Sequence, residues 1–136
     1  MTKIAVASTI EAPLTKVWDY WTKPEHITKW AFASDDWAAP EAENDVRVRG
    51  KFRTLMAAKD GSRSFDFDGV YTAVAEPNLI EYDMSDGRHV KISFVETKDG
   101  VEVTETFDAE TENSEELQRN GWQAILDNFK SYVENN

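Results

Sequence analysis

The sequence has 136 residues, of which 40% are hydrophobic and none is cysteine. This length predicts a single domain over residues 1–136 that buries about two-thirds of its unfolded surface, and the missing cysteines exclude disulfides, thiolate metal sites and cysteine nucleophiles. The formal net charge of -11 repels phosphate backbones and anionic lipids, so nucleic acid and membranes are poor candidate partners.

The first quarter of the chain predicts one strand and two short helices. Residues 3–10 alternate loosely and are rich in β-branched side chains, as strands are. A helix is expected to begin with Pro13 at its first position, where proline is favoured. Its apolar residues fall on one helical face: Leu14, Val17, Trp18 and Trp21. The sequence Thr22-Lys23-Pro24-Glu25 has the spacing of a capping box and predicts the start of the second helix.

The middle of the chain predicts an antiparallel meander. Between residues 45 and 108 the hydrophobic period is two, and turn signals such as Asp86-Gly87 and Asp99-Gly100 recur at regular intervals. With residues 3–10 this makes about seven strands in all. The expected strands of the meander cover residues 45–48, 51–58, 65–74, 79–84, 88–97 and 101–108.

Residues 113–136 predict one long amphipathic helix. Asn113 is expected to cap it, with Glu116 answering in the first turn. An apolar series recurs every four residues: Leu117, Gly121, Ile125, Phe129 and Val133. The glycine in this series indicates close approach of another backbone or room for a ligand. The order of elements predicts an α+β fold in which this helix covers the apolar face of a twisted sheet.

The order of elements resembles the helix-grip fold of the START-like (SRPBCC) superfamily, in which a curved sheet wraps a C-terminal helix. More specific motifs are similar to proteins related to the C-terminal domain of the activator of the heat-shock-protein-90 ATPase. They are Ile10-Glu11-Ala12-Pro13, Thr22-Lys23-Pro24-Glu25, Phe67-Asp68-Gly69-Val70-Tyr71, Asp86-Gly87-Arg88 and Gln118 to Leu126. The resemblance covers essentially the whole chain. One departure is Arg49, where relatives often carry a second glycine before Gly50.

The resemblance turns strand alternation into a cavity prediction, because residues on the concave face point toward the C-terminal helix. The expected lining from the sheet comprises Phe52, Met56, Phe67, Tyr71, Tyr82, Phe94 and Glu105. The helix is expected to add Trp122, Ile125 and Phe129. The segment before the second strand supplies Trp30, Phe32 and Trp37, which line the cavity mouth or tie down a long loop. The same faces could also close into a solid core.

Glu105 is the carboxylate of greatest interest in this pattern. It alternates with Val103 and Phe107, so it faces inward if they do. A carboxyl in an apolar pocket has a raised pKa and suits acid–base chemistry or binding of a polar ligand group. The alternative is that a bulge turns it outward, or that a base such as Arg47 or Arg53 pairs with it.

Function is the least determined property of the sequence. No metal motif, phosphate loop or cofactor motif is present, and no nucleophile–base pair identifies catalytic residues. The favoured hypothesis is binding of a small apolar or aromatic molecule, lipid-like or polyketide-like. The alternatives are an enzyme of the polyketide cyclase or aromatase type, and a module that binds a chaperone or another protein, as the resemblance implies. The N-terminal segment lacks the features of a signal peptide, which predicts a cytoplasmic location.

Overall fold

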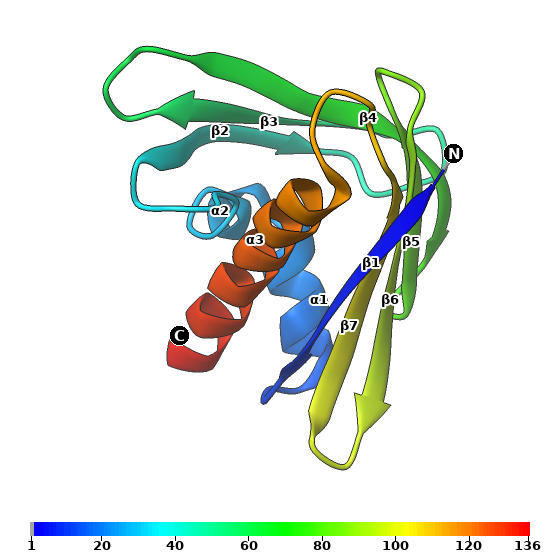
Figure 1. Cartoon of the computed structure of the whole chain (residues 1–136). Coiled ribbons are helices and arrows are strands. Elements are labelled where there is room, and N and C mark those ends of the chain that lie inside the picture. The colour runs from blue at the N-terminus through cyan, green and yellow to red at the C-terminus, as the bar shows by residue number, and fades with distance from the viewer. Residues whose placement is uncertain (1) are drawn as a thin grey trace.

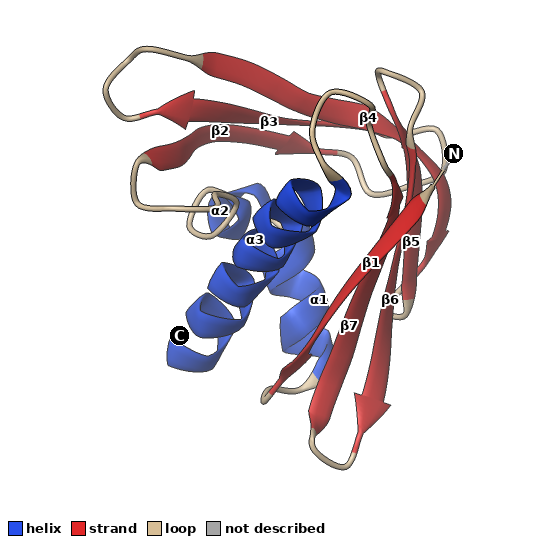
Figure 2. Cartoon of the chain, viewed as in Figure 1, coloured by secondary structure: helices blue, strands red, loops and turns tan. Residues whose placement is uncertain are grey.

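The computed structural model describes residues 2–136 and shows a curled antiparallel sheet that wraps a long helix (Figures 1 and 2). Seven strands pair in the order β1-β7-β6-β5-β4-β3-β2. In chain order the elements are β1 (Lys3–Ile10), α1 (Leu14–Thr22), α2 (Pro24–Ile27), β2 (Trp37–Asn44), β3 (Lys51–Ala58), β4 (Ser64–Ala75), β5 (Leu79–Met84), β6 (His89–Thr97), β7 (Gly100–Asp108) and α3 (Glu115–Asn135). The predicted α+β helix-grip architecture is confirmed.

Strand alternation decides which residues face the helix. Along β7 the buried residues Val101, Val103, Glu105 and Phe107 alternate with more exposed ones as far as Thr106. The largest fully buried side chains come from both the sheet and α3, and include Phe94, Phe107, Phe129 and Leu126. The core therefore lies between the concave face of the sheet and α3. Within residues 2–136, no helix is long and apolar enough to cross a membrane.

The second strand is not where the sequence pattern placed it. The strand expected at residues 45–48 is wrong, because β2 runs over Trp37–Asn44. This segment contains Pro40 and few large apolar residues, so its pattern does not resemble a strand. It is the last strand in the order and pairs only with β3, and an edge strand tolerates a proline that cannot donate a ladder hydrogen bond.

Residues 45–50 instead form a tight turn between β2 and β3. The Gly50 N–H donates to the Arg47 carbonyl at 2.8 Å. A side chain at Gly50 would lie 2.0 Å from the carbonyl oxygen of Asp45, so only glycine fits there. Arg49 has a φ of 73°, in the left-handed region that glycine adopts most easily. Glycine would adopt this backbone conformation without strain.

The start of α3 also differs from the prediction. Ser114, rather than Asn113, is the N-cap, and its hydroxyl accepts from the Leu117 N–H at 3.1 Å. Leu117 is 58% exposed, whereas Gln118 is buried. A four-residue repeat drifts by about 40° per step on a helix of 3.6 residues per turn. Leu117 and Val133 therefore cannot share one face, and Val133 is the member that is buried.

The two short helices are present, but their first residues differ from the prediction. Pro13 is the N-cap of α1 rather than its first residue. The predicted capping box at Thr22 is wrong, since Lys23 precedes α2 and makes no side-chain cap. The Thr22 hydroxyl donates to the Trp18 carbonyl at 2.8 Å in the last turn of α1. Together α1 and α2 place Trp21, Ile27 and Trp30 beside α3 and the sheet.

Candidate functional site

A cavity of about 340 Å³ lies between the concave face of the sheet and the helices. Strands β2, β3, β4, β5 and β7 supply one wall, and α1, α2 and the first half of α3 supply the other. The structure brings nine of the predicted site residues to this cavity. They are Trp30, Phe52, Met56, Phe67, Tyr71, Tyr82, Glu105, Trp122 and Ile125.

Aromatic rings form most of the cavity wall. Phe52 packs edge-to-face on Tyr82 with ring centroids 4.6 Å apart. Gly69 makes room for Phe52, because a side chain there would lie 2.9 Å from the Phe52 ring. On the opposite side Trp122 stacks on Phe107, with centroids 3.8 Å apart and planes 9° from parallel. Trp122 reaches Phe67 across the cavity at 6.0 Å.

Glu105 points into this apolar surrounding. It is 6% exposed and lines the cavity, so the outward-facing alternative is wrong. Arg53 pairs with Asp66 and Glu41, and Arg47 pairs with Asp45, so neither base serves Glu105. No hydrogen bond or ion pair reaches its carboxyl from residues 2–136. Burial raises the pKa of Glu105 to about 8, because water no longer stabilises the charge.

Two tyrosines lie near the same part of the cavity. Burial raises the pKa of the Tyr82 phenol well above its usual value, and the negative charge of Glu105 raises it further. The Tyr71 hydroxyl donates to the side-chain oxygen of Asn44. Asn44 in turn donates to the Thr22 carbonyl at 2.7 Å, which ties the end of β2 to the end of α1. Tyr71 is therefore fixed by its hydrogen bond, whereas Tyr82 interacts with Glu105 through the charge of the carboxylate.

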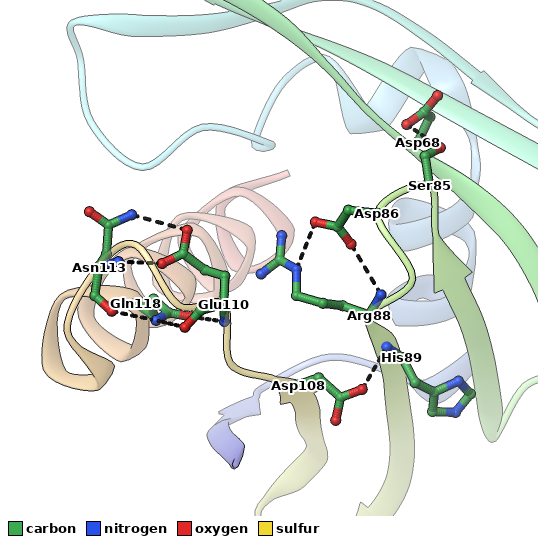
Figure 3. A network of polar contacts seen from close by, with 9 residues as sticks. All are labelled: Asp68, Ser85, Asp86, Arg88, His89, Asp108, Glu110, Asn113 and Gln118. Carbon is green, nitrogen blue, oxygen red and sulfur yellow. Dashed lines mark hydrogen bonds and ion pairs between the residues drawn. The ribbon is translucent and has the colours of Figure 1, made fainter. Parts of the chain in front are cut away.

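Charged and amide side chains surround the end of the cavity near the start of α3 (Figure 3). Gln118 Oε1 accepts from the Glu110 N–H at 2.8 Å, and its Nε2 donates to the Asn113 carbonyl at 2.9 Å. The Glu110 carboxylate accepts from the Asn113 N–H at 2.6 Å. Arg88 Nε donates to Asp86 at 2.9 Å. The contacts of Gln118 and Glu110 fix the turn that joins β7 to α3, whereas the contact of Arg88 with Asp86 lies in the turn between β5 and β6.

Four predicted site residues do not line the cavity. Phe94 and Phe129 are fully buried in the core, where both rings pack against Trp21. Phe32 borders a separate shallow pocket beside the middle of α3. Trp37 packs on Phe65, a cavity-lining residue, with centroids 5.9 Å apart.

Several lining residues were missed by sequence reasoning. Thr54 lies between Phe52 and Met56 in the alternation of β3 but was not predicted as a site residue, although it is buried and lines the cavity. Asn44 lies on the unrecognised strand β2. Arg88, Glu110, Asn113 and Gln118 come from turns or from the start of α3, where no periodic pattern indicates side-chain direction. The Asp86-Gly87 turn signal next to Arg88 was the available clue.

A second polar cluster lies outside the cavity lining. His89 contacts Asp83 through Nδ1 at 2.7 Å and Glu81 through Nε2 at 2.9 Å. These two carboxylates raise the pKa of His89. Asp108 accepts from the His89 N–H at 2.9 Å and pairs with Lys3 at 2.6 Å, and these donors lower its pKa (Figure 3). Within residues 2–136, no group of three His, Asp or Glu side chains is placed to hold a metal ion.

Comparisons with known proteins place this geometry in a family. A family model described as Activator of Hsp90 ATPase homolog 1-like protein matches residues 11–134. The solution structure of an AHSA1-like protein from Aeromonas hydrophila is 45% identical, with a TM-score of 0.93 over 98% of this chain and 93% of that one.

Other solved structures agree with that placement. A protein from Cytophaga hutchinsonii is 54% identical, with a TM-score of 0.85 over 98% of this chain and 92% of that one. One from Chromobacterium violaceum is 20% identical, with a TM-score of 0.87 over 98% of this chain and 99% of that one, and shows the fold alone. No curated protein matches the chain. Because the family model covers most of its length, the chain belongs to the Activator of Hsp90 ATPase homolog 1-like family.

Proposed function

We propose that the protein binds a small apolar or aromatic molecule in the cavity between the sheet and α3. The observation that carries the proposal is the aromatic cavity of about 340 Å³ with one buried carboxyl in its wall. Pockets of this size with apolar walls and few polar groups are typical of small-molecule sites. A solid core would have filled this volume, because protein interiors are close-packed.

The nine predicted residues that line the cavity are the proposed contacts. Phe52, Phe67, Tyr82 and Trp122 offer ring faces and edges to a flat ligand. Trp30, Met56, Tyr71 and Ile125 extend the apolar wall. Glu105 supplies a polar group that fixes the orientation of the ligand. Phe94 and Phe129 pack behind the wall on Trp21, and Trp37 packs on Phe65, whereas Phe32 borders the separate pocket beside α3.

Native mass spectrometry of the purified protein tests the proposal first, because a co-purified ligand would add its mass. Tryptophan fluorescence then follows titration with fatty acids, sterols, flavonoids and chalcones, since Trp21, Trp30 and Trp122 line the cavity. Saturable quenching is expected. The proposal would be contradicted if the protein carries no added mass and no member of the panel quenches its fluorescence.

A pair of matched variants locates the response. Thr54 is buried in the cavity wall, whereas Thr72 is exposed on the neighbouring strand β4. Thr54→Phe fills the cavity and should abolish quenching, while Thr72→Phe should leave it unchanged. Circular dichroism and thermal unfolding confirm that both variants fold. Quenching that survives in folded Thr54→Phe would place the binding site elsewhere.

A second candidate is an enzyme of the cyclase or aromatase type, and Glu105 favours it. A carboxyl with a pKa of about 8 can both donate and accept a proton near neutral pH. Turnover of an aromatic polyketide mimic, lost in Glu105→Gln, would support this function. Binding without turnover would favour a carrier or sensor.

The family description favours a protein partner as a third candidate, because it refers to an activator of a chaperone ATPase. Stimulation of the heat-shock-protein-90 ATPase by the purified protein tests this directly. A rate that stays at its basal value across a range of protein concentrations would exclude it. A cytoplasmic location stays a prediction.

A further inference from the structure

The cavity wall holds one buried carboxyl that has no hydrogen-bond or ion-pair partner in the part of the chain that the structure describes. Glu105 is 6% exposed and lines the cavity, and burial is the only cause of its raised pKa. Its neighbours in the sheet are Val6 on β1 and Ile92 on β6, which are apolar. A buried carboxyl without a partner is unfavourable. A cation inside the cavity would remove this cost.

Aromatic rings beside the carboxyl also favour a cation. Phe52, Tyr71 and Tyr82 form one cluster, with ring centroids 4.6 to 6.1 Å apart. Phe67 packs beside this cluster, with its ring centroid 5.9 Å from that of Phe52, and Trp122 on α3 approaches Phe67 from the opposite wall. The face of an aromatic ring attracts a cation within about 6 Å of its centre, and aromatic cages recognise alkylammonium groups in this way.

The remaining charges of the cavity point in the same direction. The other titratable or charged groups of the lining are Tyr71, Tyr82, Arg88, Glu43 and Glu110. Helices α1, α2 and α3 add only neutral side chains to it. Arg88 is the one cation among these residues, and Asp86 holds its Nε at 2.9 Å. With a net charge of -11, the protein attracts cations and repels anions.

We propose that the cavity selects an organic amine, whose protonated ammonium group pairs with the Glu105 carboxylate while its apolar or aromatic body lies among the rings. This inference rests on the proposed function and names its ligand class. When Glu105 carries a proton, that proton leaves to solvent as the ammonium binds, so the charges balance. The bound pair has no net charge.

Three probes with the same body test the choice of class. They are 4-phenylbutylamine, 4-phenyl-1-butanol and 4-phenylbutanoate, which are cationic, neutral and anionic at pH 7. Isothermal titration at pH 7 should show that the amine binds at least tenfold more tightly than the alcohol, with the carboxylate weakest. Titrations in two buffers of different ionisation enthalpy should show release of most of one proton with the amine and none with the alcohol.

A matched pair of variants and a pH series assign the preference to Glu105. Glu105→Gln should bind amine and alcohol alike, whereas Glu102→Gln should behave as wild type, because Glu102 is exposed on the other face of β7. In the wild type, amine affinity should rise as the pH is raised toward the pKa of Glu105, by up to about tenfold per pH unit. Alcohol affinity should not rise. The pH series of the wild type tests the role of Glu105 even if Glu105→Gln folds poorly.

The outcomes separate the inference from the function on which it rests. If the alcohol binds as well as or better than the amine, the amine proposal is overturned and the cavity remains a binding site. An amine preference that persists in folded Glu105→Gln also overturns it. Failure of all three probes to bind, together with the failed panel described above, contradicts both proposals.

Discussion

Two carboxyls on the same strand have almost the same solvent exposure and opposite acid–base behaviour. Glu105 is 6% exposed and Asp108 is 8% exposed. The pKa of Glu105 rises to about 8, whereas hydrogen bonds from Lys3 and the His89 N–H lower the pKa of Asp108. The residues are three positions apart, so they face opposite sides of the sheet. Glu105 lies deep among apolar side chains, whereas Asp108 lies close to the surface beside two donors, so depth and donors together decide which form of each carboxyl is stable.

The largest expected effect is the pH dependence of stability that Glu105 causes. The folded state of the wild type holds a proton on Glu105 that the unfolded chain releases above its pKa of 4.5. Stability due to this group is therefore complete below pH 4.5 and is lost as pH rises to about 8. Relative to Glu105→Gln, the wild type should lose about 1.4 kcal/mol per pH unit in that window, on the order of 5 kcal/mol in all.

Urea unfolding of both proteins at pH 5, 6, 7 and 8 measures this difference. The two stability curves should diverge as pH rises and run parallel above the pKa of Glu105. Curves that stay parallel from pH 5 to pH 8 would show that Glu105 ionises normally. The difference in acid–base behaviour between Glu105 and Asp108 would then not arise from a raised pKa of Glu105.

Trp122→Ala tests the wall that keeps water from Glu105. Trp122 stacks on Phe107, which lies between the two carboxyls on β7. Removing a fully buried tryptophan costs about 3 to 5 kcal/mol, and Trp122 is only half-buried, so a loss of about 2 to 3 kcal/mol is expected. Water that enters should also lower the pKa of Glu105 toward its usual value. A denaturation midpoint equal to that of wild type would show that this part of α3 is not docked on the sheet.

Asp108→Asn tests the other side of the comparison. This change removes the charge that pairs with Lys3, and a hydrogen bond to a charged group contributes about 1.5 to 3 kcal/mol. Lys3 is exposed, so a loss of about 1 to 2 kcal/mol at pH 7 is expected. Because the pKa of Asp108 is lowered by folding, its contribution is present above the unfolded pKa and lost on acidification. Thermal unfolding at pH 7 and pH 3 should show the difference shrinking at low pH.

Glu102→Gln is the smallest expected effect. Glu102 is exposed on β7, three residues before Glu105. Surface substitutions of this kind change stability by about 0.5 kcal/mol or less. Urea unfolding from pH 5 to 8 should give a curve parallel to that of wild type. A slope change comparable to that of Glu105→Gln would mean that the effect belongs to net charge and not to the cavity.

Alternation along well-formed strands was sufficient to predict much of the site. The inward direction of Phe52, Phe67, Tyr82 and Glu105 follows from a period of two, and the structure agrees with it. Alternation gives the face of the sheet but not the position along it. Phe94 shares the face of Glu105 yet lies where the tryptophans of α1 fill the space completely. Depth depends on how the helices pack, which local pattern does not encode.

Edges and turns were beyond the same reasoning. The strand Trp37–Asn44 contains a proline and several small or charged residues, and its edge position relaxes the usual pattern. Asn44 was missed for that reason. Arg88 and Gln118 contact the cavity from a turn and from the first turns of α3, where hydrogen bonds set the direction of the side chain. Asp86 holds Arg88 within its own turn, and the Glu110 N–H holds Gln118 across the turn before α3, and hydrophobic periodicity encodes neither bond.

The arginine at position 49 shows how one turn can be maintained in two ways. Its left-handed backbone costs about 1 to 2 kcal/mol for a residue with a side chain. Glycine would avoid that strain but would give the unfolded chain more conformations, which costs about 0.4 to 1 kcal/mol on folding. The Arg49 N–H donates to the Tyr71 carbonyl at 2.8 Å, a bond that the backbone of either residue can make. Entropy in the unfolded chain thus offsets about half of the strain in the folded chain, so exchange of arginine and glycine here is expected to change stability by about 1 kcal/mol or less.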